Sequence, residues 1–251
     1  MISLLQLLKE TQSSPKAIFL AGPAGSGKSY ISKQFLPNTF KWINSDDTYE
    51  ELLKASGIGL KQKDFTPDEL SQASKLQAQA RNTTKDILSK SIEGRQNLVI
   101  DGTGAASNPL LKKKQELEDL GYETFMLMIY VSPLTSLERN VDRERSLMPG
   151  IILRTWEGVN RNIDTYRQAF GESFIIIDND PEGANKGFSQ DLISPYLKGS
   201  SAIGKPKTPE QEAQSREQKL KLKQDIENII GKIPKFTPLE VAKQKISQFT
   251  S

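Results

Sequence analysis

The sequence contains no cysteine and no histidine among its 251 residues. These absences exclude disulfides, thiol nucleophiles, thiolate zinc sites and imidazole general bases. Any general base must therefore be a carboxylate or, less commonly, a lysine or a tyrosine. The absence of cysteine is also compatible with a reducing compartment.

The sequence also lacks long apolar runs and a strong charge of one sign. Its longest apolar run, Phe125–Val131, is far shorter than a membrane span. The first ten residues have no basic segment and too short an apolar stretch for a signal peptide. Residues 1–198 carry 24 basic and 25 acidic residues, whereas residues 199–251 carry 10 and 6. We therefore expect a cytoplasmic protein with a neutral body, which does not track a nucleic-acid duplex, and a mildly basic tail.

Five short apolar runs alternate with helical patterns. The predicted strands are Lys16–Ala21, Phe40–Asn44, Asn97–Ile100, Thr124–Val131 and Ser173–Ile177. The helices predicted between them cover residues 28–36, 48–55, 67–92, 108–120, 133–145 and 152–170. This alternation predicts an α/β fold in which one parallel sheet is covered by helices on both faces.

The composition changes after residue 198 and predicts three parts: a domain over 1–198, a linker over 199–208 and a helical extension over 209–251. Capping patterns at Thr208 and Thr237 each start a helix with an apolar stripe. Those stripes must pack on the body, on a second copy or on a protein partner, and the sequence leaves these alternatives open.

A glycine-rich loop follows the first predicted strand and has the P-loop pattern in full: Gly22, Pro23, Ala24, Gly25, Ser26, Gly27, Lys28 and Ser29. Glycines allow successive backbone N–H groups to surround phosphate oxygens, and the following helix adds the positive end of its dipole. We expect Lys28 to reach the β- and γ-phosphates of ATP and the Ser29 hydroxyl to bind Mg²⁺.

Acidic residues end the second and third predicted strands, where side chains face the ligand crevice of a parallel sheet. Asp46 is the predicted general base, although Asp46 or Asp47 could instead cap the next helix. Asp101 is the predicted ligand of Mg²⁺ or of its waters, although an aspartate before a glycine is also ordinary in a turn.

Arg139 and Arg143 share one helix face that ends at Pro149-Gly150. Such a charged run is usually a solvated surface. It is also typical of a mobile lid whose arginines neutralise the transferring phosphoryl group.

The P-loop, the INSDD and IDGTG motifs at residues 43–47 and 100–104, and residues 132–146 together resemble the polynucleotide-kinase and zeta-toxin group of P-loop kinases. The resemblance covers roughly residues 16–180. It implies a sheet order of 2-3-1-4-5, ATP and Mg²⁺ held by Lys28 and Ser29, Asp46 as base and Arg143 in the lid. End-healing polynucleotide kinases have an arginine shortly after the paired aspartates, whereas Thr48 and Tyr49 follow here, which weakens the case for a nucleic-acid acceptor.

We therefore expect a kinase whose acceptor is a polynucleotide 5′-hydroxyl, a nucleotide sugar, a modified nucleoside or another small hydroxylated molecule. A toxin-type kinase would have the same chemistry and would need a neutralising protein. In a third alternative, the P-loop belongs to an assembly protein without turnover that docks through its C-terminal helices.

Overall fold

The structure is a computed structural model that describes residues 14–61, 64–141, 147–182, 184, 208–230, 232 and 235–251. Its strands are β1 (Lys16–Ala21), β2 (Lys41–Ile43), β3 (Leu98–Asp101), β4 (Glu123–Tyr130) and β5 (Phe174–Asp178). Its helices before residue 180 are α2 (Lys28–Phe35), α3 (Ser45–Ala55), α4 (Pro67–Glu93), α5 (Ser107–Asp119), α6 (Pro133–Val141), α7 (Pro149–Arg161) and α8 (Ile163–Phe170). Helices α10 (Pro209–Ile230) and α11 (Leu239–Thr250) follow in the tail.

The five strands form one sheet in the order β2-β3-β1-β4-β5, as predicted, and every pairing is parallel. The register sets Phe19 of β1 opposite Ile100 of β3 and Met126 of β4. The carboxyl ends of the strands therefore meet at one edge of the sheet, where the loops after β1, β2 and β3 lie side by side.

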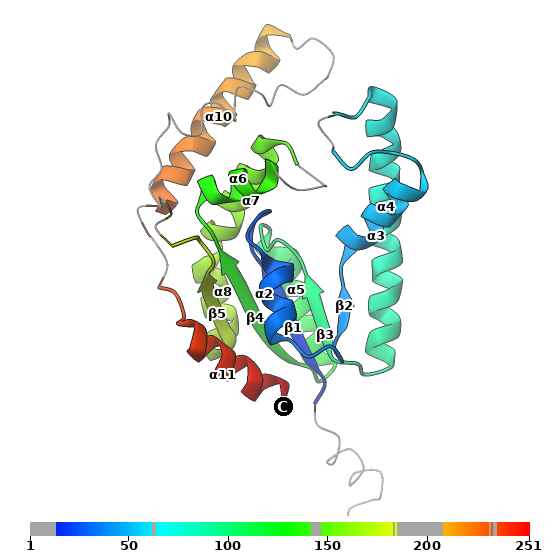
Figure 1. Cartoon of the computed structure of the whole chain (residues 1–251), viewed down its shortest axis with the longest axis vertical. Helices are drawn as coiled ribbons and strands as arrows, with labels where there is room; N and C mark the ends of the chain where they lie inside the picture. The colour runs from blue at the N-terminus through cyan, green and yellow to red at the C-terminus, as the bar shows by residue number, and fades with distance from the viewer. Residues whose placement is uncertain are drawn as a thin grey trace, which may run out of the picture.

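The strands bury apolar side chains on both faces because successive residues point in opposite directions. Ile18 and Leu20 of β1 pack in the layer that contains α2 and α11, whereas Ala17, Phe19 and Ala21 pack in the layer that contains α5, α7 and α8. Figure 1 shows α2 on one face of the sheet and α5 and α8 on the other. The fold has three layers, α/β/α.

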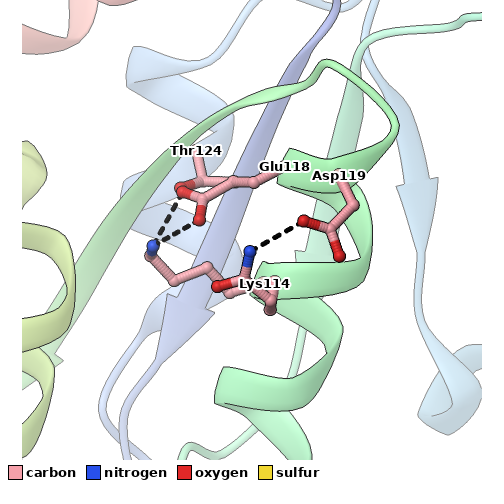
Figure 2. Close-up of polar contacts among 5 residues, drawn as sticks. Lys114, Glu118, Asp119 and Thr124 are labelled. Atoms are coloured by element: carbon pink, nitrogen blue, oxygen red, sulfur yellow. Dashed lines mark hydrogen bonds and ion pairs between the residues drawn. The ribbon is translucent and has the colours of Figure 1, made fainter.

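Polar contacts fix α5 against β4. The Thr124 hydroxyl at the start of β4 donates to the Glu118 carboxylate, which also accepts from the Lys114 ammonium at 2.7 Å (Figure 2). Lys114 additionally lies 5.2 Å from the centre of the Phe170 ring of α8. Lys114 thus contacts α8 directly and β4 through Glu118.

Helices α3 and α4 pair with each other beyond β2, at one edge of the sheet (Figure 1). Their own small core contains Tyr49, Leu53, Phe65 and Ala80. A capping box starts α4: the Thr66 hydroxyl accepts from the Glu69 amide and the Glu69 carboxylate accepts from the Thr66 amide.

The tail packs on the body, which is one of the three alternatives left open by the sequence. Ile226 of α10 is buried in the layer of α7, while Ala242 and Ile246 of α11 are buried in the layer of α2. The Phe249 ring lies 5.0 Å from that of Phe125 on β4. The Thr237 amide donates to the Ile176 carbonyl oxygen of β5 at 2.7 Å. The chain between α10 and α11 therefore lies along the free edge of β5.

Two expectations about helices are wrong. The helix expected over residues 48–55 begins at Ser45, and its N-cap is Asn44, whose side chain accepts from the Asp46 amide at 2.8 Å; neither aspartate is the cap. The helix expected over residues 152–170 is two helices that meet at Asn162. The Asn162 side chain donates to the Ala105 carbonyl oxygen at 3.0 Å. The periodicity of apolar residues within one helix cannot predict a contact with a residue 57 positions away.

Some predictions concern residues that the structure does not describe. These residues are 1–13 at the N-terminus, Arg143 and residues 199–207 of the predicted linker. Among the helices of the described ranges, none is both long enough and apolar enough to span a bilayer.

Candidate functional site

The P-loop backbone forms a cradle at the end of β1. Gly25 and Gly27 have φ angles of 79° and 80°, in the left-handed region that favours glycine. A Cβ atom at Gly25 would lie 2.7 Å from the Ser136 carbonyl oxygen, and one at Gly27 would lie 2.5 Å from the Asn179 amide nitrogen. Gly27 is the N-cap of α2 and brings no capping side chain, so the first amide groups of this helix are available to an anion.

Lys28 closes the cradle from inside. Its ammonium donates to the Gly22 carbonyl oxygen at 2.8 Å and approaches that of Pro23 at 3.4 Å. The ammonium is thus folded back over the loop, at the position from which it would meet a bound phosphate. Ser26 lies wholly buried within the loop.

Two neighbouring elements hold the P-loop from outside. The Ser136 hydroxyl of α6 donates to the Ala24 carbonyl oxygen. The Arg139 guanidinium donates to the carbonyl oxygens of Gly25 at 3.3 Å and Asn179 at 2.9 Å. Asn179, directly after β5, donates from its side-chain amide to the Ser26 carbonyl oxygen at 2.8 Å. These contacts use carbonyl groups of the loop and none of its amide groups.

Sequence reasoning missed Ser136 and Asn179. A signal for Asn179 was present, because polar residues at the carboxyl end of a strand singled out Asp46 and Asp101 and the same rule applies after the fifth strand. Ser136 had no such signal, since a serine inside a helix is usually unremarkable in sequence.

A cavity of about 340 Å³ opens in front of the cradle. Residues from four separate segments line it: Lys28 and Ser29, Asn44 to Asp47 with Glu50, Asp101 to Thr103, and Leu147 with Thr155. The predicted base, the predicted metal ligands and the P-loop lysine thus share one cavity. The Asn44 amide joins two of these segments, because it donates to the Asp101 carboxylate at 3.3 Å.

The described residues that line this cavity carry an excess of negative charge. Burial raises the pKa of Asp101, the Lys28 ammonium lowers it, and the carboxylates of Asp46 and Asp47 raise it again. Burial likewise raises the pKa of Asp47, against the hydrogen bond from Asn44. A cation placed among these carboxylates would relieve their mutual repulsion.

The donor set at this cavity fits Mg²⁺. Magnesium is held by one or two carboxylates together with hydroxyl, phosphate and water oxygens. Asp101 at the end of β3 supplies a carboxylate, and Ser29 in the first turn of α2, which follows the neighbouring strand β1, supplies a hydroxyl. In the described part of the chain there is no cluster of three or more acidic side chains close enough to hold a metal alone. Phosphate oxygens would therefore complete the coordination.

The predicted arginines have different outcomes. Arg139 binds the outer face of the loop and does not line the cavity. Its expected contact with a nucleotide stays a prediction. Arg143 lies outside the described residues, so its lid role also stays a prediction.

Comparison with known proteins gives the family and the fold. The Zeta toxin family matches residues 3–171, about two thirds of the chain. No curated protein matches the sequence. The crystal structure of AvrRxo1-ORF1:-ORF2 with ATP is 13% identical, with a TM-score of 0.51 over 97% of this chain and 82% of that chain. The PezAT toxin-antitoxin structure of Streptococcus pneumoniae is 18% identical, with a TM-score of 0.47 over 78% of this chain and 89% of that chain.

The Pnkp1/Rnl/Hen1 RNA repair complex is also similar, at 15% identity and a TM-score of 0.44 over 63% of this chain and 48% of that chain. At 13% identity the AvrRxo1-ORF1:-ORF2 structure indicates a shared fold only. The family match covers the P-loop, both acidic motifs and most of the sheet. The resemblance predicted from the motifs is confirmed, and the chain belongs to the Zeta toxin family.

Proposed function

We propose that this protein is an ATP-dependent phosphotransferase that moves the γ-phosphate of ATP onto a hydroxyl group. The observation that carries the proposal is the shared cavity in which Lys28 of α2, Asp46 of α3 and Asp101 of β3 meet. A P-loop alone indicates nucleotide binding. A P-loop that faces carboxylates on two neighbouring loops also has the groups that phosphoryl transfer requires.

The cradle and Lys28 would bind the phosphates. The inward amide groups of the loop and the start of α2 surround the β-phosphate, and the Lys28 ammonium neutralises charge on the β- and γ-phosphates. Ser29 and Asp101 would hold Mg²⁺, which, when bound, offsets the negative charge that develops between the β- and γ-phosphates.

Asp46 would act as the general base. An Asp46 carboxylate oxygen accepts the proton of the acceptor hydroxyl as the hydroxyl oxygen forms its bond to the γ-phosphorus. The bond between that phosphorus and the β–γ bridging oxygen breaks, and ADP leaves. Asp47 lines the same cavity and is the competing base.

The charged side chains that line the P-loop cavity affect which acceptor it can bind. Of the side chains described as lining it, Lys28 is the single cation, against the carboxylates of Asp46, Asp47, Glu50 and Asp101. A phosphate at the reacting end of the acceptor would meet repulsion from these groups. The balance favours a neutral hydroxyl end, as in a nucleotide sugar or a modified nucleoside, over a polynucleotide end.

The test is transfer of radiolabelled γ-phosphate to a panel of oligonucleotides, nucleosides and nucleotide sugars, with Lys28→Ala as the paired variant. We expect label on one class of acceptor with the parent and none with Lys28→Ala. ATP with Mg²⁺ should stabilise the parent against heat but not the variant, while both melt alike without ligand. ATP turnover with no labelled acceptor would instead support the assembly-protein alternative.

Family membership favours a second candidate, in which the same chemistry is toxic and a partner protein neutralises it. Expression of the parent would then arrest growth, and Asp46→Asn would abolish the arrest. Arrest that persists with Asp46→Asn would separate toxicity from phosphoryl transfer. The assembly-protein alternative needs C-terminal helices that are free to dock, yet Ile226 and Ile246 are buried in the body.

A further inference from the structure

A second and larger cavity lies away from the P-loop, beside the free edge of β5. Its volume is about 660 Å³, within the range of small-molecule sites. The end of α7, the start of α8, strand β5, the end of α10 and the chain before α11 all line it. It shares no lining residue with the P-loop cavity. Figure 1 shows α8, β5 and α10 on the side of the sheet opposite α3 and α4.

The rim of this cavity is basic. Four cationic side chains line it, against the single carboxylate of Asp164; they are Arg161, Arg167, Lys232 and Lys235. Because residues 1–198 are nearly neutral overall, this is a local concentration of positive charge. Two pieces of chain that are distant in sequence, the α7–α8 junction and the tail, supply equal shares of it.

Two of these four cationic side chains form no ion pair with a described residue. Arg161 pairs with Glu157 at 3.0 Å and Arg167 pairs with Asp164 at 2.6 Å. Lys232 and Lys235 are exposed and have no ion pair with another described residue. Each arginine also has further N–H donors beyond the one used in its pair.

The floor of the cavity is apolar and its wall has hydrogen-bonding groups. Phe174 and Ile176 of β5 form the floor together with Ile163 of α8. Asn160 lines the cavity and is buried; its amide donates to the Trp156 carbonyl oxygen at 2.8 Å. Asn228 and Thr237 are further polar side chains of the cavity lining.

We propose that this cavity is a second binding site, for a small organic phosphate of nucleotide size. The cationic rim binds the phosphate, the apolar floor takes the organic body, and the polar wall orients it. The site is distinct from the proposed ATP site in residues and in charge. It depends on the tail, because α10 contributes Asn228 and Ile229 and the chain before α11 contributes Lys232, Lys235 and Thr237.

The experiment uses the full-length chain carrying Lys28→Ala, so that the P-loop does not compete for phosphate. Calorimetric titration with AMP, UMP, glucose 6-phosphate and inorganic phosphate measures binding at low and at physiological salt. We expect at least one organic phosphate to bind with a Kd of about 1 mM or tighter, and more tightly than inorganic phosphate. Its affinity should fall as salt rises.

Charge reversal then locates the site. Lys232→Glu with Lys235→Glu should weaken that binding at least tenfold. The matched control, Lys75→Glu with Lys85→Glu, makes the same charge change at exposed positions of α4 and should weaken it less than twofold. Asn228→Asp, at an exposed lining position, is a further variant that adds one negative charge to the cavity. All variants should melt within about 2 °C of the parent, because the substituted side chains are exposed.

Three results would overturn the proposal. In the first, none of the organic phosphates binds the Lys28→Ala chain. In the second, inorganic phosphate binds as tightly as every organic probe, which leaves the apolar floor without a role. In the third, the α4 control loses as much affinity as the cavity variant. Because each result is obtained without a working P-loop, none of them bears on the proposed transferase activity.

Discussion

The two cavities differ in charge and in the way the fold builds them. By its described lining residues the P-loop cavity is acidic, and it lies at the carboxyl ends of strands, where Lys28 begins α2, Asp46 lies in the first turn of α3 and Asp101 ends β3. The cavity beside β5 is basic and forms only where the tail returns to the α7–α8 junction. Sequence motifs therefore predict the first cavity, whereas the second depends on tertiary packing and has no sequence motif.

The largest expected effect is on transfer. Asp46→Asn removes the proposed base and should lower the rate of transfer by about 10²–10⁴-fold, with ATP affinity little changed. Asp47→Asn is the matched control and should lower the rate less than tenfold. Single-turnover transfer rates measured at saturating ATP give both values. A larger loss with Asp47→Asn would assign the base to the neighbouring residue.

The next effect concerns the stability supplied by the tail. Ile246 is buried between α11 and the sheet, so Ile246→Ala should lower the free energy of unfolding by about 2–4 kcal/mol. Val241→Ala, on the exposed side of the same helix, should cost less than about 0.5 kcal/mol. Urea unfolding measures both, and ATP titration of the folded variants should give the affinity of the parent.

Removal of the whole tail extends the same test. The proposed boundary at residue 198 predicts that a chain ending at Leu197 stays folded and binds ATP. The structure adds that truncation uncovers Phe125 and Ile176, so we expect a lower Tm and a tendency to associate in light scattering. A truncated chain that is folded but does not bind ATP would make the tail part of the nucleotide site.

A smaller effect is expected where β5 meets the P-loop. Asn179→Ala removes one hydrogen bond to the Ser26 carbonyl oxygen and should weaken ATP binding about 3–10-fold, equal to the net value of one hydrogen bond. Asn38→Ala, in the exposed turn after α2, is the control and should leave the affinity unchanged. Equal affinities for the two variants would show that the P-loop keeps its shape without this contact.

The smallest effect is a gain in stability. The pKa of Asp101 is raised from 3.8 by burial, so the folded chain holds this proton more tightly than the unfolded chain does. Stability therefore declines as pH rises from about 4 through the raised pKa. Asp101→Asn should remove that decline and raise the Tm of the ligand-free protein at pH 7 by about 2–4 °C. A Tm that falls, or a decline with pH that persists, would contradict a repulsive role for this carboxylate.

The local sequence determined the parts of the fold that depend on near neighbours. The five strands, the P-loop between β1 and α2 and the capping box of α4 follow from periodicity, glycine placement and capping. The sheet order implied by the family resemblance also agrees with the structure. The meeting of Lys28, Asp46 and Asp101 agrees as well, because parallel strands bring their carboxyl ends together.

Tertiary contacts decided the rest. Asn44 caps α3 while its side-chain amide also reaches Asp101, 57 residues later. The helical break at Asn162 follows a contact with Ala105, and the P-loop is held by Asn179 from 153 residues away. An amphipathic stripe predicts that one face of a helix is buried. It does not predict which surface covers that face, because the hydrophobic effect is non-directional. Only the folded chain shows α10 and α11 on the body and the basic cavity that they help to enclose.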